Sequence, residues 1–86
     1  MKLRLESGQE ALALAYDGNL LKVSSPLAFA PGSPIRFTVA CEAGERTFEG
    51  RVVRSKRVDD QTFEVRMRFV NLRREDRELL LSTLGP

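Results

Sequence analysis

Apolar and polar residues alternate with a period of two along much of this chain. In TFEVRMRFV, residues 62–70, apolar residues alternate with Glu64, Arg66 and Arg68. The same pattern occurs in PIRFTVAC, residues 34–41, and more briefly in KLRLE, residues 2–6. Successive side chains of a β-strand point to opposite faces of the sheet, so each segment predicts a strand with one buried face.

The segment RTFEGRVVRS, residues 46–55, predicts a longer strand with an irregularity in it. Gly50 lies within the strand, and the adjacent Val52 and Val53 interrupt the alternation. An extra residue in one strand shifts the pattern in this way, so we expect a β-bulge or a sharp bend here. Residues 14–24 predict a strand, a turn and a second strand near 20–24, whose boundaries are uncertain by two residues.

Turn-forming residues separate these segments, at 7–8, 17–19, 31–34, 42–44 and 59–60. Asp17-Gly18-Asn19 is typical of a hairpin turn whose central residues have positive φ. About six short strands joined by short turns predict an antiparallel barrel or sandwich.

The apolar spacing changes after residue 70, in NLRREDRELLLSTLGP. Apolar residues here recur at helical intervals: Leu72, Leu79, Leu80 and Leu84. We expect a helix of about three turns that ends before residues 85–86 and packs its leucines on the barrel or on a partner. Asn71 is the expected N-cap, and Glu75 and Asp76 lie near the positive end of the helix dipole.

Composition restricts the chemistry. Eighty-six residues form one small domain, 1–86, and 42% hydrophobic and 30% charged residues are typical of a globular protein. The chain has no His and one Cys, Cys41, which excludes thiolate or imidazole metal cages, disulfide frameworks and Ser-His or Cys-His nucleophile pairs. We therefore expect no metal, no cofactor and no enzyme activity, and we expect Cys41 to be a small inward-facing hydrophobe.

The sequence also predicts a cytoplasmic location. A single free cysteine and the lack of a recognisable secretory signal favour a reducing compartment. No apolar segment approaches the roughly 20 residues that a membrane-spanning helix needs, so we expect no membrane insertion.

Positive charge is concentrated in the second half of the chain. The net charge is +2, but residues 46–86 contain ten cations and seven acids, whereas residues 1–45 contain four cations and five acids. The C-terminal half is therefore the place to look for an anionic partner. Three further arginines begin the expected helix and either face solvent or meet an acidic partner: Arg73, Arg74 and Arg77.

Two partner-binding features are candidates. Arg66 and Arg68 point outward from their strand, and Arg51 on the preceding strand is expected beside them, forming a wall for a phosphate, an acidic partner or nucleic acid. The alternative is a solvated face that Glu49 and Glu64 partly neutralise.

The second candidate is the loop SSPLAFAPGSP, residues 24–34. Its apolar residues, Leu27 and Phe29, either close the end of the barrel or form a patch for a partner. Aromatic residues that could stack on bases are scarce, since Phe37, Phe63 and Phe69 belong to apolar faces and only Tyr16 could be exposed. Nucleic-acid binding is therefore a weaker alternative.

Three segments together resemble the PilZ family of bacterial domains: SPLAFAPGSPIRFTV, GRVVRS and FEVRMRFVNLRREDRELLLSTL. The resemblance covers residues 14–84 and is most specific in RFVNLRREDRELL. It implies an all-β fold, a small six-stranded antiparallel barrel with one C-terminal α-helix, in the bacterial cytoplasm.

The resemblance also implies where a ligand would bind. Family members that bind cyclic di-GMP use an Arg-x-x-x-Arg segment before the barrel and an Asp/Asn-x-Ser-x-x-Gly turn between the second and third strands. Here Arg4 has no second arginine four residues later, and the turn from Asp17 has Asn19 in the Ser position and Lys22 in the Gly position. Asp17-Gly18-Asn19 is therefore interpreted as a turn that closes a hairpin and contacts no nucleotide.

The resulting hypothesis is a non-catalytic regulatory or adaptor module that binds a cytoplasmic protein, with little or no affinity for cyclic di-GMP. Divergent members of this kind are associated with bacterial motility, pilus assembly and cell polarity. The expected contact residues are Leu27, Phe29, Arg51, Arg66 and Arg68. One alternative is a cyclic di-GMP receptor with a non-standard site made of Arg4, Asp17 and Asn19, and a second is a small nucleic-acid-binding barrel.

Overall fold

A computed structural model describes residues 1–42 and 44–85. Six strands and one helix follow one another as predicted: β1 (Lys2–Leu5), β2 (Glu10–Tyr16), β3 (Leu21–Ser25), β4 (Pro34–Cys41), β5 (Gly44–Asp59), β6 (Thr62–Phe69) and α1 (Arg74–Leu84). The predicted turn at residues 42–44 and the chain end at residues 85–86 include Ala43 and Pro86, which lie outside the described residues.

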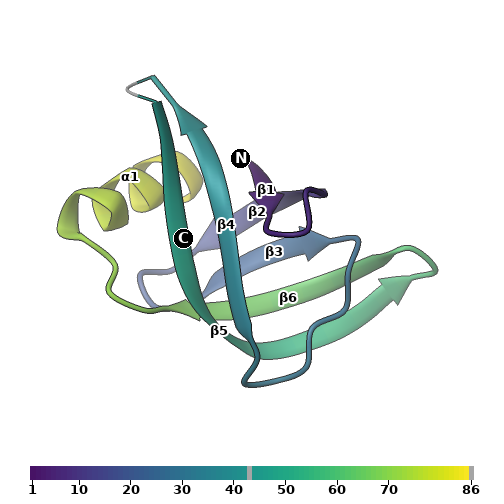
Figure 1. The fold of residues 1–86 in the computed structure, drawn as a ribbon. Coiled ribbons are helices and arrows are strands. Elements are labelled where there is room, and N and C mark those ends of the chain that lie inside the picture. Colours follow the sequence, from purple (N-terminus) through teal and green to yellow (C-terminus); the bar gives the residue numbers. More distant parts are fainter. Residues whose placement is uncertain (43, 86) are drawn as a thin grey trace.

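The strands form a closed antiparallel barrel in the order β1-β2-β3-β6-β5-β4, so the barrel alternative is confirmed. The last strand, β6, lies between β3 and β5, which are far from each other in sequence (Figure 1). The first strand, β1, completes the ring through a short ladder in which Arg4 pairs with Thr38 and Leu5 with Phe37.

The inward faces of the strands form the core, as their alternation predicts. This core contains an aromatic cluster, in which the ring centroids of Phe37 and Phe48 are 5.5 Å apart and those of Phe48 and Phe69 are 5.8 Å apart. The expectation that Tyr16 could be exposed is wrong. Its side chain is 2% exposed, because its ring packs edge-to-face on Phe69 at 5.6 Å.

The predicted irregularity in β5 is a β-bulge. Val52 pairs with Met67, but the next paired residue, Arg54, lies opposite Arg66, so Val53 is the extra residue. The bulge keeps Val52 in the core and turns both Val53 and Arg54 outward, where they are exposed.

Helix α1 begins later than predicted, and Asn71 is not its N-cap. Arg73 occupies the N-cap position and makes no side-chain capping hydrogen bond. Asn71 instead has φ of 56°, a left-handed conformation that Asn tolerates better than most residues, and it turns the chain away from β6. The helix therefore starts at Arg74.

The helix packs on the barrel through Leu80, which is fully buried, with Leu84 and Leu72 partly buried against the same core. Its first turn is tied to β5 by an ion pair between Arg46 and Asp76. Among the residues described here, no helix has both the length and the apolar character needed to cross a bilayer.

Candidate functional site

The turn between β2 and β3 uses its own carboxylate to hold its backbone. One oxygen of Asp17, Oδ1, accepts hydrogen bonds from the backbone amides of Asn19 at 2.7 Å and Leu20 at 2.8 Å. The two hydrogen bonds lower the pKa of the Asp17 carboxyl below its ordinary value, and the bond from Leu20 has the larger effect. Gly18 supplies the positive φ of 92° that the turn requires, whereas Asn19 does not have a positive φ. The structure therefore gives Asp17 a turn-forming role.

The fold does not bring Arg4 close to Asp17 and Asn19, the other two residues of the alternative cyclic di-GMP site. Arg4 pairs with Glu10 at the start of β2, whereas Asp17 follows the end of that strand. Seven residues of strand separate these positions, or roughly 20 Å. Asp17 and Asn19 are adjacent in the turn, but Arg4 lies near the opposite end of β2.

A small pocket does lie beside this turn. It is lined by Ala15, Tyr16, Asp17, Leu20, Lys22 and Arg66. Arg77 of α1 also reaches the turn, since a Cβ atom placed on Gly18 would lie 3.3 Å from its Nη2 atom. The two cations from β3 and β6 and the arginine from α1 make the surroundings of the turn basic. Arg77 lies beside the turn because of the way the helix docks on the barrel, and no pattern in the sequence predicted this proximity.

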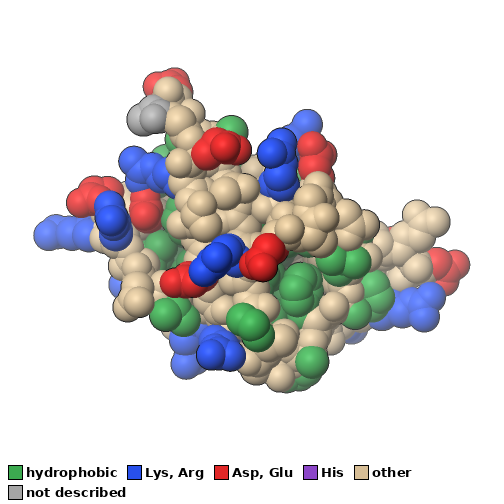
Figure 2. Space-filling model, viewed as in Figure 1, with side chains coloured by type: hydrophobic (Ala, Val, Ile, Leu, Met, Phe, Trp, Pro, Cys, Tyr) green, Lys and Arg blue, Asp and Glu red, His purple; other side chains and the backbone are tan. Residues whose placement is uncertain are grey.

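A larger groove, of about 720 Å³, lies where the loop between β3 and β4 passes over the barrel. We call it the loop groove; its lining residues are Leu5, Glu6, Ser7, Leu27, Phe29, Pro34, Ile35, Arg36, Glu49, Gly50, Arg51 and Val70. Figure 2 shows hydrophobic side chains gathered on this face. Leu27 and Phe29 pack partly against the core, and both also line the groove.

The wall of the loop groove that carries Leu27 and Phe29 is fixed by hydrogen bonds. The buried Ser25 hydroxyl donates to the carbonyl of Leu27 at 2.9 Å and accepts from its amide at 3.0 Å. The amide of Phe29 lies 3.4 Å from the Ser55 hydroxyl that accepts its hydrogen bond. A partner would therefore meet apolar side chains that are already positioned, which reduces the entropy lost on binding.

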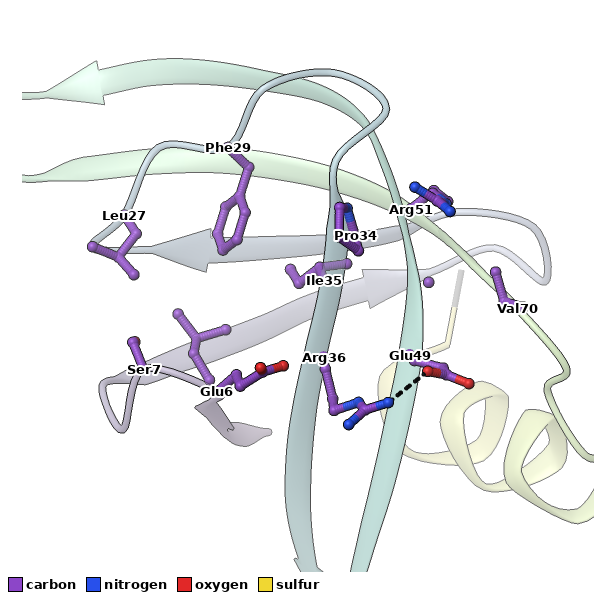
Figure 3. A pocket seen from close by; sticks show the side chains of 12 residues that line it. Glu6, Ser7, Leu27, Phe29, Pro34, Ile35, Arg36, Glu49, Arg51 and Val70 are labelled. Atoms are coloured by element: carbon purple, nitrogen blue, oxygen red, sulfur yellow. Dashed lines mark hydrogen bonds and ion pairs between the residues drawn. The ribbon is translucent and has the colours of Figure 1, made fainter.

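The opposite wall of the loop groove is charged. Figure 3 shows Leu27 and Phe29 on one side of the groove and Arg51 and Val70 on the other. Arg36 and Glu49 form an ion pair at 3.1 Å along one edge, and Arg51 Nη1 donates to the carbonyl of Gly32 at 3.2 Å. The groove thus combines an apolar wall with a charged wall, and protein-binding surfaces commonly combine apolar and polar areas in this way.

The predicted arginine wall also exists, and it is larger than predicted. Strand pairing places Arg51 directly opposite Arg68, and Arg66 between Lys22 of β3 and Arg54 of β5. We call the outer surface of β3, β6 and residues 51–56 of β5 the basic face; its charged residues are Lys22, Arg51, Arg54, Lys56, Glu64, Arg66 and Arg68. Arg51 belongs to both surfaces, whereas Arg66 and Arg68 do not line the loop groove.

Sequence analysis missed three members of the basic face, namely Lys22, Arg54 and Lys56. The bulge at Val53 reverses the alternation of β5, so Arg54 and Lys56 point outward together with Arg51. Continuing the count of alternate residues past the expected bulge would have identified both residues. The strand order that places Lys22 beside Arg66 could not be obtained from the pattern of a single strand.

Comparisons with known proteins show what the chain as a whole resembles. No curated protein and no solved structure matches it at a significant level. The family model described as PilZ domain matches residues 14–84, which include the turn at Asp17, the loop groove residues from Leu27 onward and the whole basic face. With most of its length matched and the barrel and helix that the resemblance implies, the chain belongs to the PilZ domain family.

Proposed function

We propose that this PilZ domain is a non-catalytic regulatory or adaptor module that binds another protein in the bacterial cytoplasm, with little or no affinity for cyclic di-GMP. Control of motility, pilus assembly or cell polarity is the process in which we expect it to act. The observation that carries the proposal is the engagement of Asp17 Oδ1 by the amides of Asn19 and Leu20. Both hydrogen bonds occupy Oδ1 and commit the carboxylate to holding the turn, so only Oδ2 is left to accept from the edge of a guanine base.

Two further observations support the proposal. Arg4 lies roughly 20 Å along the strand from Asp17, so the arginine and the turn do not line one common pocket. The loop groove offers a preformed apolar wall, and the basic face offers a charged surface. Together they suit a protein partner. The expected contacts are Leu27, Phe29 and Arg51 in the groove, with Arg66 and Arg68 on the basic face.

Titration calorimetry with cyclic di-GMP tests the nucleotide part of the proposal. We expect no heat of binding up to about a millimolar ligand, at either low or physiological salt. A PilZ domain that carries both nucleotide-binding motifs provides the positive control. Binding in the low micromolar range would contradict the proposal, and its loss in Arg4→Ala or Asp17→Ala would assign the non-standard site.

Photo-crosslinking in the native cells tests the protein-binding part. A photoreactive residue is introduced at Val70, which is 43% exposed in the loop groove, or at Leu12, which is 46% exposed on β2. We expect a discrete adduct with one protein from position 70 and none from position 12. The absence of an adduct at position 70, or equal labelling at both positions, would contradict the assignment of the groove as a contact surface.

A further inference from the structure

The fold separates positive from negative charge more strongly than the order of residues along the chain does. The basic face holds six of the fourteen cations and one of the twelve acids. The remainder of the chain therefore has eight cations and eleven acids, a net charge of −3, while the basic face has +5. Asp17 lies at the border of this face, close enough to Arg66 for the guanidinium to lower the carboxyl pKa further. This separation orients the molecule toward an anionic partner.

The strand geometry arranges these cations in a grid. Lys22, Arg66 and Arg54 form a row across three strands, with about 4.8 Å between neighbouring strands. Arg66 and Arg68 are alternate residues of β6, so their positions are about 6.8 Å apart along the strand. This distance equals the separation of alternate residues in an extended peptide, so an extended segment with an acid at every second residue matches the grid.

Other anionic partners fit the basic face less well. All six aromatic side chains of the protein are buried or half-buried, so none is presented on this face to stack on a nucleic-acid base. The β5–β6 hairpin at the edge of the face ends in Asp59 and Asp60, and the Asp60 side chain is 99% exposed. Arg57 pairs with Asp60 at 3.1 Å, so the two aspartates and this arginine give the tip a net charge of −1, which opposes docking on an anionic membrane surface.

We propose that the basic face binds an acidic protein segment in an extended conformation, with carboxylates at alternate residues paired to Arg66, Arg68 and their cross-strand neighbours. Arginine suits this role because its planar guanidinium can bind a carboxylate through two hydrogen bonds. Within residues 1–42 and 44–85, Arg66 donates to Glu64 at 3.4 Å and Arg51 donates to the carbonyl of Gly32 at 3.2 Å, each through a single guanidinium nitrogen. The inference rests on the proposed function, because a protein segment is a partner only if the domain acts by binding a protein.

The test is a titration of the ¹⁵N-labelled protein, followed by amide chemical shifts, with two synthetic peptides of about eight residues. One alternates Glu and Thr, and the other has the same composition in two blocks. We expect the alternating peptide to shift amides of β3, β5 and β6 and to bind about fivefold more tightly than the block peptide, with both affinities falling as salt is added. No shifts at millimolar peptide, shifts confined to the loop groove, or equal affinity for the two peptides would overturn the inference.

Two variants locate the interaction. Arg66→Ala with Arg68→Ala is expected to weaken binding of the alternating peptide about tenfold. Arg73→Ala with Arg74→Ala removes the same charge at the N-terminus of α1 and is expected to leave the affinity within about twofold. Equal losses in the two double variants would mean attraction by net charge alone and would overturn the inference. Tighter binding of duplex DNA or of phosphatidylglycerol vesicles than of the alternating peptide would also overturn it. A parallel titration with cyclic di-GMP separates the two proposals, since nucleotide binding contradicts the proposed function and leaves the peptide result intact.

Discussion

Gly50 is a glycine whose position in the barrel leaves no room for a side chain. A Cβ atom at this position would lie 2.2 Å from the backbone oxygen of Arg68 and 2.5 Å from Cε of Met67. The backbone oxygen belongs to the β5–β6 ladder and cannot move without disturbing it. We expect Gly50→Ala to lower the free energy of unfolding by about 1–3 kcal/mol, measured by urea denaturation.

Gly8→Ala is the matched control for this substitution. Gly8 has φ of 93° but no atom within 4 Å of its added Cβ, so its cost is backbone strain alone, about 1–2 kcal/mol. If Gly50→Ala left the unfolding midpoint unchanged while Gly8→Ala lowered it, close packing at Gly50 would be refuted. This result would also mean that close packing does not explain why a glycine occurs inside β5.

Asp17 gives a prediction about pH. The amides of Leu20 and Asn19 donate to its carboxylate in the folded state and hold its pKa below the ordinary value. The unfolded chain therefore binds the proton more tightly, so this group stabilises the fold above its unfolded pKa, and the contribution is lost as pH falls through the folded pKa. An NMR titration of the Asp17 carboxyl is expected to give a pKa below that of a model peptide, and Asp17→Asn should flatten the loss of stability in acid. A pKa at or above the model-peptide value would contradict this.

Helix α1 is an element whose attachment depends on a few side chains. Leu80 is fully buried in the barrel core, and its neighbour Leu81 is 36% exposed. We expect Leu80→Ala to reduce the free energy of unfolding by about 2–5 kcal/mol, because it loses buried area and leaves a cavity. Leu81→Ala should cost less than about 1 kcal/mol. Similar effects of the two substitutions in urea denaturation would show that the helix does not dock as described.

How much the sequence predicted also differs between elements. The period-two segments gave β1, β4 and β6 with their buried faces, because alternation is imposed by the backbone of any half-buried strand. The start of α1 was misplaced, since Asn71 is equally suited to an N-cap and to a left-handed turn, and only the path of the chain after β6 distinguishes the two. Tyr16 was misjudged because its cover, Phe69, comes from a distant strand.

Some residues of the candidate surfaces could be predicted from the sequence, and others could not. Arg51, Arg66 and Arg68 were found because they lie on the polar faces of strands with clear alternation. The pairing of Lys22 with Arg66 depends on β6 lying beside β3, which is a property of the topology. The loop groove also combines residues from distant parts of the chain, and no local pattern reveals that Val70 faces Leu27 across it.

At the scale of the whole molecule, the barrel is closed most weakly between β1 and β4. This ladder has two paired positions, whereas the β4–β5 ladder has eight. The amide of Glu6 donates across this seam to the carbonyl of Arg36 at 3.1 Å. We expect this amide to exchange with solvent at least about tenfold faster than that of Met67 at the centre of β6, because the seam opens without global unfolding. Equal exchange rates in NMR hydrogen exchange would show that the barrel opens only as a unit.

The place of β6 between β3 and β5 determines when this protein can fold during its synthesis. A nascent chain that has reached residue 61 has β3 and β5 but not the strand that joins them, so both carry an unpaired edge. Only residues 62–69 complete the ring. They pair with β5 across a two-residue turn, but their contacts with β3 are distant in sequence and slow to form. Until then the growing chain has two strand edges available to neighbouring chains, and a chain interrupted before residue 62 keeps them.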